Sequence, residues 1–278
     1  ATSALHMEKK LRMTPDQVTA AAAMLFHADK SGVQCGLISS AFPDAELEDA
    51  YRIQDALIDL HYTAGRSRIG WKIGLTSRAM QQALGITTPD SGVLLDSMLF
   101  QSGDTVAKGR FIQPRIEAEI AFVMGKDIAG AGRSRADVIA ATDYVAPCLE
   151  ILDTRILRAD PATGKARIIT DTVSDNAANA GIVMGDRTHA PDAHDLRWAG
   201  AIVARDGVVE ETGLGAGVLN DPATGIIWLL DRLALFGKGL KAGEIVLSGS
   251  FIRPVEAPAG SVFAADFGAF GRVDLTFS

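Results

Sequence analysis

The sequence predicts an α+β fold in which a small helical N-terminal region, residues 1–75, precedes a larger β-rich domain, residues 76–278. Up to about residue 64, apolar residues recur three and four positions apart, which is the spacing of amphipathic helices. From about Gly92, short apolar runs alternate with turns rich in Gly, Asp and Pro, as expected of strands. Of the 278 residues, 47% are hydrophobic, so the chain can bury a substantial core.

Helix starts and ends can be placed from capping residues. Thr14 can cap a helix that begins with Pro15, and Gln17 can complete a capping box. Gly85 is expected to close a short third helix. The expected helices cover residues 14–30, 46–64, 76–84 and 224–236. The expected strands cover residues 116–124, 144–152, 198–204, 208–211, 244–247 and 271–277, and residues 69–74 are strand-like.

Charge and cysteine usage narrow the class of protein. The formal net charge is −7, with acidic and basic residues mixed along the chain, which argues against a nucleic-acid partner. No apolar run approaches the roughly 18 residues that a membrane helix needs, so no membrane partner is expected. Cys35 and Cys148 form no CxxC pair, which favours a reducing cytoplasm. These features are typical of a protein that handles small molecules.

Glu117 and Glu119 are candidate metal ligands. In a strand, side chains at i and i+2 share a face, so the two carboxylates are expected to project together. Neighbouring carboxylates repel unless a proton or a cation lies between them, and Mg²⁺ and Mn²⁺ prefer oxygen ligands. A solvated strand face is the alternative. Apolar residues at 116, 118 and 120 favour a buried strand instead.

Glu150 lies within the apolar run 145–152. An unpaired buried charge is very costly, so this carboxylate needs a partner. Two interpretations stay open. It is either a third metal ligand or one half of a core salt bridge with Arg115 or Arg155.

Lys72 and Asp90 are candidates for proton transfer. Lys72 lies in the apolar, glycine-flanked segment 69–74, and a buried lysine becomes a useful acid, base or charge stabiliser. The alternative is an ordinary lysine whose ammonium reaches solvent. Asp90, within 89–92, by itself predicts a turn.

Six segments follow one another in order: GWKIGLTSRAMQQALG (70–85), PDSGVLLDSM (89–98), QPRIEAEIAF (113–122), APCLEILDTR (146–155), DTVSDNAANAG (171–181) and IVLSGSFIRP (245–254). In this order they resemble the fumarylacetoacetate hydrolase superfamily, on its hydratase and decarboxylase branch. The resemblance spans residues 46–278. Trp71 is a departure, because near relatives often have a histidine there.

This resemblance implies a β-rich roll of the fumarylacetoacetate hydrolase type with flanking helices. The metal motif of the family falls on Glu117, Glu119 and Glu150, and its acid/base pair on Lys72 and Asp90. The residues that it implies for the substrate carboxylate are those of one turn, Ser248, Gly249 and Ser250. It also implies a homo-oligomer, with a decamer as the suggested size.

The resemblance further implies a divalent-metal-dependent lyase that acts on a small 2-oxo acid. Residues 160–181 favour a hydratase of aromatic catabolism that converts 2-oxo-hept-4-ene-1,7-dioate into 4-hydroxy-2-oxoheptanedioate. The alternatives are hydration of 2-hydroxypenta-2,4-dienoate, decarboxylation of 2-oxo-hex-3-enedioate, and a metal-binding assembly protein without turnover.

A seven-carbon diacid has a second carboxylate, which an arginine can bind with two parallel hydrogen bonds. Residues 153–167 carry four basic side chains: Arg155, Arg158, Lys165 and Arg167. Arg155 is the best candidate because it follows the Glu150 strand closely. For the other three, a solvated loop is the expectation.

Overall fold

The computed structural model describes residues 11–278, which fall into two compact units. The first unit is formed by the stretch that ends at Ser67 together with residues 153–178, and the second by residues 68–152 and 179–278. The helical unit therefore ends earlier than the expected boundary at residue 75 and gains a second stretch. That stretch belongs to it because Val173 packs in one cluster with Ala50 and Tyr51.

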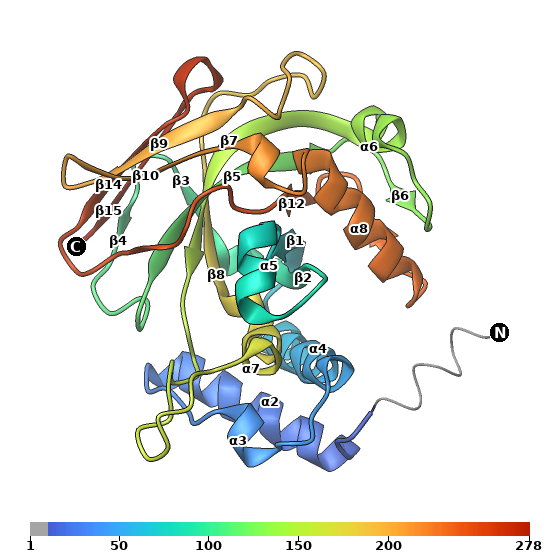
Figure 1. Ribbon diagram of the computed structural model, residues 1–278, viewed down its shortest axis with the longest axis vertical. Helices are drawn as coiled ribbons and strands as arrows, with labels where there is room; N and C mark the ends of the chain where they lie inside the picture. The colour runs from blue at the N-terminus through green and yellow to red at the C-terminus, as the bar shows by residue number, and fades with distance from the viewer. Residues whose placement is uncertain (1–10) are drawn as a thin grey trace. The chain divides into compact units, whose positions relative to one another are not determined.

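The first unit is built from helices (Figure 1): α2 (Pro15–Ser31), α3 (Ile38–Ala41), α4 (Leu47–Thr63) and α7 (Ile169–Ser174). The expected capping box is confirmed. The Gln17 backbone N–H donates to the Thr14 hydroxyl, and the Thr14 N–H donates to the Gln17 side chain. Gly32, at φ 71°, ends α2 in the left-handed conformation that glycine adopts without strain. Leu25 and Ile53 bring the apolar faces of α2 and α4 together in one core.

The second unit contains an eight-stranded mixed sheet. Seven strands follow one another in the order β2 (Asp90–Leu95), β1 (Arg68–Gly74), β12 (Ile245–Leu247), β5 (Arg115–Met124), β7 (Thr142–Leu152), β8 (Asn179–Met184) and β3 (Leu99–Gln101), and β13 (Val255–Glu256) also pairs with β5. The pairs β1–β12 and β3–β8 are parallel. Figure 1 shows β5 and β7 as long neighbouring strands, and they are antiparallel.

Two smaller sheets and three helices complete this unit. The five-stranded sheet has the order β10 (Val208–Leu214), β9 (Gly200–Arg205), β14 (Val262–Asp266), β15 (Arg272–Phe277) and β4 (Thr105–Val106). The two-stranded sheet pairs β11 (Gly239–Leu240) with β6 (Ile128–Ala129). The helices are α5 (Arg78–Leu84), α6 (Arg135–Ala141) and α8 (Pro222–Ala234), with single 3₁₀ turns η2 (Asp96–Met98), η4 (Gly215–Gly217) and η5 (Gly268–Phe270).

A buried apolar cluster lies on one face of the large sheet. Its buried residues include Leu94, Ala121, Ala146, Cys148, Ile182 and Leu247, contributed by five different strands. Helix α8 approaches the sheet closely at Gly225, where a Cβ atom would lie 2.8 Å from the main-chain oxygen of Ser248. A side chain at Gly225 would therefore push α8 away from the turn that follows β12.

Most expected elements form, and the differences have physical causes. The turn expected at 89–92 is instead the start of β2. This segment pairs antiparallel with β1, with Asp90 opposite Gly74 and Gly92 opposite Lys72. Cross-strand pairing outweighs the local turn preference of Pro, Asp, Ser and Gly there. Strands β8 and β14 were not expected from the sequence.

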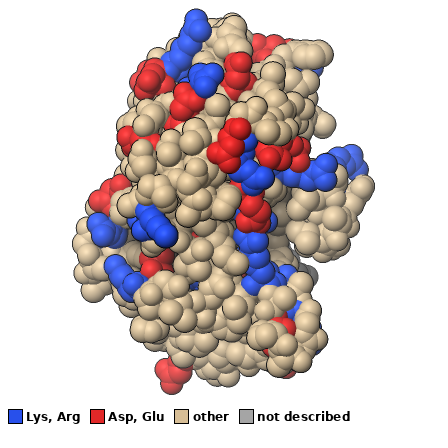
Figure 2. All heavy atoms as spheres, turned by 90° about the vertical axis from the view of Figure 1, so that its left-hand side faces the viewer, with Lys and Arg blue, Asp and Glu red and all other residues tan. Residues whose placement is uncertain are grey.

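The surface gives no sign of a large basic patch on the face that Figure 2 shows, where Lys and Arg are interspersed with Asp and Glu. Within residues 11–278, no helix has both the length and the apolar character that crossing a membrane demands.

Phe263 on β14 should contribute strongly to the stability of the five-stranded sheet. It is fully buried and lies edge-on to Phe277 at 5.9 Å, whereas the adjacent Val262 is 49% exposed. We expect Phe263→Ala to lower the free energy of unfolding by about 3–5 kcal/mol. Val262→Ala, the control on the opposite face of the same strand, should change it by less than about 0.5 kcal/mol. Urea unfolding of both variants checks this, and equal effects would contradict the assigned faces of β14.

Candidate metal and acid–base centre

Three glutamates meet on one face of two paired strands. Glu117 and Glu119 alternate along β5 and so share a face, and Glu117 lies directly opposite Glu150 on β7. One carboxylate oxygen from each of the three lies within 4.8 Å of those of the others. The opposite face of β5 is packed by Ile116, Ala118 and Ile120, which are fully buried. The alternation of apolar and acidic residues therefore directs the carboxylates to one point.

The cluster is electrostatically costly without a cation. Glu119 and Glu150 are fully buried, and Glu117 is partly exposed. Burial and then the negative charge of Glu150 raise the pKa of Glu117 to about 8. The same two causes raise the pKa of Glu119 well above its usual range. Carboxylates in such a group attract either protons or a divalent cation.

The donor set fits a hard divalent cation. The Oε1 atoms of Glu119 and Glu150 are buried and have no hydrogen-bond donor among residues 11–278. Buried acceptors in this state are uncommon, and a cation would satisfy both at once. The three carboxylates could therefore hold a divalent cation.

Lys72 connects this cluster to Asp90. Its ammonium nitrogen lies 3.4 Å from Glu150 Oε2, so the ion-pair partner of Glu150 is Lys72 and not the expected Arg115 or Arg155. Glu150 also belongs to the carboxylate cluster, and its role as a metal ligand stays a prediction. Burial alone would lower the pKa of Lys72, but the charges of Glu150 and Asp90 outweigh it and raise the pKa above its ordinary value. Lys72 is only 3% exposed, so the solvent-reaching lysine is excluded.

Asp90 lies opposite Gly74 at the start of β2 and is 2% exposed. Burial raises its pKa, and the neighbouring Lys72 charge opposes that shift. A Cβ atom on Gly74 would collide with Asp90 Oδ1 and lie 3.1 Å from the Lys72 ammonium. Gly74 therefore gives these two side chains the space to approach each other. The sequence signal for this role is a glycine two positions after Lys72 on the same strand face.

The turn formed by Ser248, Gly249 and Ser250 contacts the carboxylate cluster through a backbone N–H group. The Gly249 N–H donates to Glu119 Oε2 at 2.9 Å. The Ser248 hydroxyl donates to the main-chain oxygen of Ile120, and that of Ser250 to the main-chain oxygen of Ile252. Gly249 has φ 124°, and a Cβ atom there would collide with Thr76. A role of this turn in binding a substrate carboxylate stays a prediction.

Arg155 belongs to the first unit, where it forms a buried pair with Asp175. Its Nε donates to Asp175 Oδ1 at 2.7 Å, and its backbone N–H donates to Oδ2 at 2.9 Å. A terminal nitrogen also donates to the Asp175 main-chain oxygen at 3.0 Å. This ion pair was not foreseen, and the predicted contact with a distal substrate carboxylate stays a prediction.

Two residues beside the cluster were missed by sequence reasoning. Asn179, at the start of β8, is fully buried and donates from Nδ2 to Glu150 Oε2 at 2.8 Å. Cys148 lies directly opposite Glu119 on β7. Burial, together with the charges of Glu119 and Glu150, raises the pKa of the Cys148 thiol well above its usual range. The position of an asparagine just before an apolar run was the only signal for Asn179.

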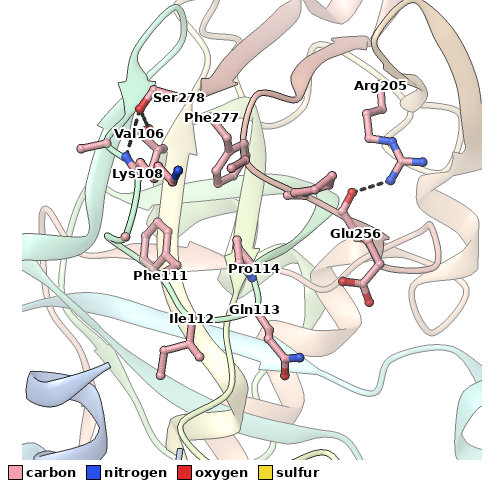
Figure 3. Close-up of a pocket in the computed structure, with 15 residues that line it drawn as sticks. Val106, Lys108, Phe111, Ile112, Gln113, Pro114, Arg205, Glu256, Phe277 and Ser278 are labelled. Atoms are coloured by element: carbon pink, nitrogen blue, oxygen red, sulfur yellow. Dashed lines mark hydrogen bonds between the residues drawn. The ribbon is translucent and has the colours of Figure 1, made fainter. Parts of the chain in front are cut away.

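A separate pocket of about 500 Å³ lies where the chain enters β5, just before Arg115 (Figure 3). Phe111, Pro114 and Phe277 contribute apolar surface to it. Arg205 is also part of its wall and donates to the main-chain oxygen of Glu256 at 2.7 Å. None of the predicted site residues is part of its wall.

Solved structures define the class of protein. 4-Oxalocrotonate decarboxylase from Pseudomonas putida G7, complexed with magnesium and adipate, matches with a TM-score of 0.90 and 30% identity over 96% of this chain and 100% of that chain. Fumarylpyruvate hydrolase from Pseudomonas aeruginosa, complexed with Mn²⁺ and pyruvate, has a TM-score of 0.55 and 15% identity over 76% and 89% of the two chains, which shows the fold alone. The fold is therefore that of the fumarylacetoacetate hydrolase class.

The most informative sequence relatives are hydratases, and they identify the branch of the superfamily to which the chain belongs. 2-Oxo-hept-4-ene-1,7-dioate hydratase of Escherichia coli is 47% identical over 93% of this chain and 97% of its own length. 2-Keto-4-pentenoate hydratase of Paraburkholderia xenovorans is 37% identical over 95% and 96%. No family model matches the chain. The chain belongs to the hydratase and decarboxylase branch of the fumarylacetoacetate hydrolase superfamily, and it is a hydro-lyase.

Removal of one central carboxylate should abolish metal binding. We expect Glu119→Gln to remove Mn²⁺ binding in isothermal titration calorimetry while the protein stays folded, because the amide keeps the shape and can still accept from Gly249. Wild type with Mn²⁺ at about 100 times its Kd should gain roughly 2.7 kcal/mol of stability. Glu210→Gln, on the surface beside Arg205, is the control and should bind Mn²⁺ as wild type does. Unchanged Mn²⁺ affinity in Glu119→Gln would rule out this site.

Proposed function

We propose that this enzyme hydrates 2-oxo-hept-4-ene-1,7-dioate, in its 2-hydroxyhepta-2,4-dienedioate form, to 4-hydroxy-2-oxoheptanedioate. The observation that carries the proposal is the 3.4 Å contact between Lys72 and Glu150, because it joins a buried proton-transfer pair to a carboxylate cluster suited to a cation. The 47% identity to the Escherichia coli hydratase over nearly the whole chain supports this substrate.

Glu117, Glu119 and Glu150 would hold the cation, for which we propose Mg²⁺ or Mn²⁺. When bound, the cation supplies a Lewis acid that stabilises negative charge developing on the substrate C2 oxygen. The two buried ligands have fixed positions, since Glu119 accepts from Gly249 and Glu150 from Asn179. The protein therefore presents preorganised carboxylates that need not rearrange when the cation binds.

The reaction moves two protons. One passes from the C2 hydroxyl to C5, which leaves a ketone conjugated to the C3–C4 double bond. The other passes from water to C3 while the water oxygen bonds to C4. An ammonium has protons to donate and a carboxylate only accepts, so we assign delivery at C5 to Lys72 and activation of water to Asp90. Both side chains lie against Gly74, so each can hold the other in position.

4-Oxalocrotonate decarboxylase shares this fold with a TM-score of 0.90, so loss of CO₂ is the outcome that product analysis must distinguish from hydration. Both reactions need the same stabilised negative charge at the C2 oxygen, but decarboxylation consumes no water. We favour hydration because the chain is 47% and 38% identical to two hydratases and 30% identical to the decarboxylase. Mass spectrometry of the product separates the two, since hydration adds one water and decarboxylation removes CO₂.

We also propose a homo-oligomer in the cytoplasm, with a decamer as the suggested size. The free thiols Cys35 and Cys148 support a reducing compartment. Light scattering that gives a monomer of 29.3 kDa at micromolar concentration would refute the oligomer.

Loss of either proton-transfer residue should reduce turnover. General acid–base groups contribute about 10²–10⁴-fold, so Lys72→Ala and Asp90→Ala should each lower kcat by that order. Neither residue belongs to the three metal ligands, so Mn²⁺ affinity should not fall. Lys238→Ala, an exposed control, should keep the wild-type kcat. A decrease in kcat of less than about threefold in both variants would show that Lys72 and Asp90 have structural roles only.

The length of the substrate can be tested through its distal carboxylate. A hydrogen bond to a charged group is worth about 1.5–3 kcal/mol, so wild type should prefer the seven-carbon diacid over 2-hydroxypenta-2,4-dienoate by roughly 10- to 150-fold in kcat/KM. If Arg155 binds this carboxylate, Arg155→Ala should lose the preference. The ratio of the two kcat/KM values is the measurement, because loss of the Asp175 ion pair alone would affect both substrates equally.

Equal turnover of the two acids by wild type would contradict the diacid assignment. Hydration of the five-carbon acid, the reaction indicated by the name of the Paraburkholderia xenovorans relative, would then be the better proposal.

A further inference from the structure

The two buried glutamates of the cluster use their oxygens in the same way. Glu119 Oε2 accepts from the Gly249 N–H at 2.9 Å, and Glu150 Oε2 accepts from Asn179 Nδ2 at 2.8 Å. The Oε1 atom of each has no donor within the described part of the chain. Each carboxylate therefore has one oxygen held by a neutral N–H group and one oxygen left for a cation.

We propose that Asn179 is a positioning residue that holds Glu150 in place as a metal ligand through one oxygen. The proposal rests on the metal site proposed above and adds a residue that does not itself contact the cation. Its role resembles that of the backbone N–H of Gly249 at Glu119, with the difference that Asn179 is a side chain and can be replaced.

The chemistry at Glu150 explains why an uncharged donor is suitable. Glu150 Oε2 already lies 3.4 Å from the Lys72 ammonium. Without the shorter bond from Asn179, the carboxylate could turn toward Lys72 and leave the cluster. A second cationic partner would hold Glu150 but would also repel a divalent cation. An amide donates one hydrogen bond without adding charge.

The backbone that precedes Asn179 is unusual. Asn176, Ala177 and Ala178 have φ values of 52°, 53° and 58°, all in the left-handed region. This conformation costs about 1–2 kcal/mol per residue for residues other than glycine. The sequence Asn-Ala-Ala would not adopt this turn without support from the fold. The turn leads directly into the first residue of β8, which is Asn179.

The test uses Asn179→Leu, which is similar in size and cannot donate. Partners that orient metal ligands typically contribute 10- to 100-fold in metal affinity. We expect isothermal titration with Mn²⁺ to give a Kd raised by that factor, and kcat to return to within about threefold of wild type when Mn²⁺ is saturating. The control is Gln54→Leu, which removes another buried amide that donates to the main-chain oxygen of Val173 at 3.0 Å. Its Mn²⁺ affinity should equal that of wild type.

A Kd for Mn²⁺ within threefold of wild type in folded Asn179→Leu would overturn the proposal, as would an equal loss in the Gln54→Leu control. A kcat that stays low at saturating Mn²⁺ would also overturn it, because Asn179 would then act on more than the metal ligand. If Asn179→Leu does not fold, Asn179→Ser replaces it, since the shorter side chain cannot span the 2.8 Å bond to Glu150.

The binding measurement needs no substrate, so it separates this proposal from the proposed function. If wild type binds Mn²⁺ and Asn179→Leu binds it weakly, the role of Asn179 stands even where wild type fails to hydrate the diacid. If wild type does not bind Mn²⁺, the metal site and the role of Asn179 fail together, whatever the activity.

Discussion

The site depends on three carboxylates that two neighbouring strands hold together in an apolar environment. Glu117, Glu119 and Glu150 present oxygens within 4.8 Å of one another, and two of the three side chains are fully buried. Carboxylates so placed repel strongly and attract positive charge. The ion pair with Lys72, the raised pKa values and the orphaned Oε1 atoms are all consequences of this arrangement.

The rest of the site is built around that repulsion. Lys72 supplies one positive charge from the side, and Gly249 and Asn179 supply neutral donors. Two glycines allow close packing here. Gly74 has no side chain to separate Asp90 from Lys72, and Gly225 lets α8 approach the turn that contains Gly249. Small residues and uncharged donors thus matter as much here as the ionisable groups.

Much of the site could be predicted from the sequence, because strand periodicity is local. The alternation of Glu117 and Glu119 within apolar residues fixes their common face without knowledge of the fold. That Glu150 lies opposite Glu117 depends on register between two strands and was not predicted; the resemblance indicated only that Glu150 joins the same metal motif. The strand at Asp90 and the roles of Gly74 and Asn179 could not be predicted, because they arise from pairing between distant segments. The buried pair of Arg155 with Asp175 was missed for the same reason.

The division of the chain between the two units has a consequence for the order in which the site assembles. Glu150 and Asn179 are separated by residues 153–178, which belong to the first unit. The hydrogen bond between them therefore closes a loop that contains residues 153–178, and these residues fold as part of the first unit. A nascent chain can pair β5 with β7 early, because both strands precede this excursion, but Glu150 lacks its amide donor until the chain returns as β8. Glu150 therefore gains its amide donor only when β8 pairs with β7, after residues 153–178 have been made.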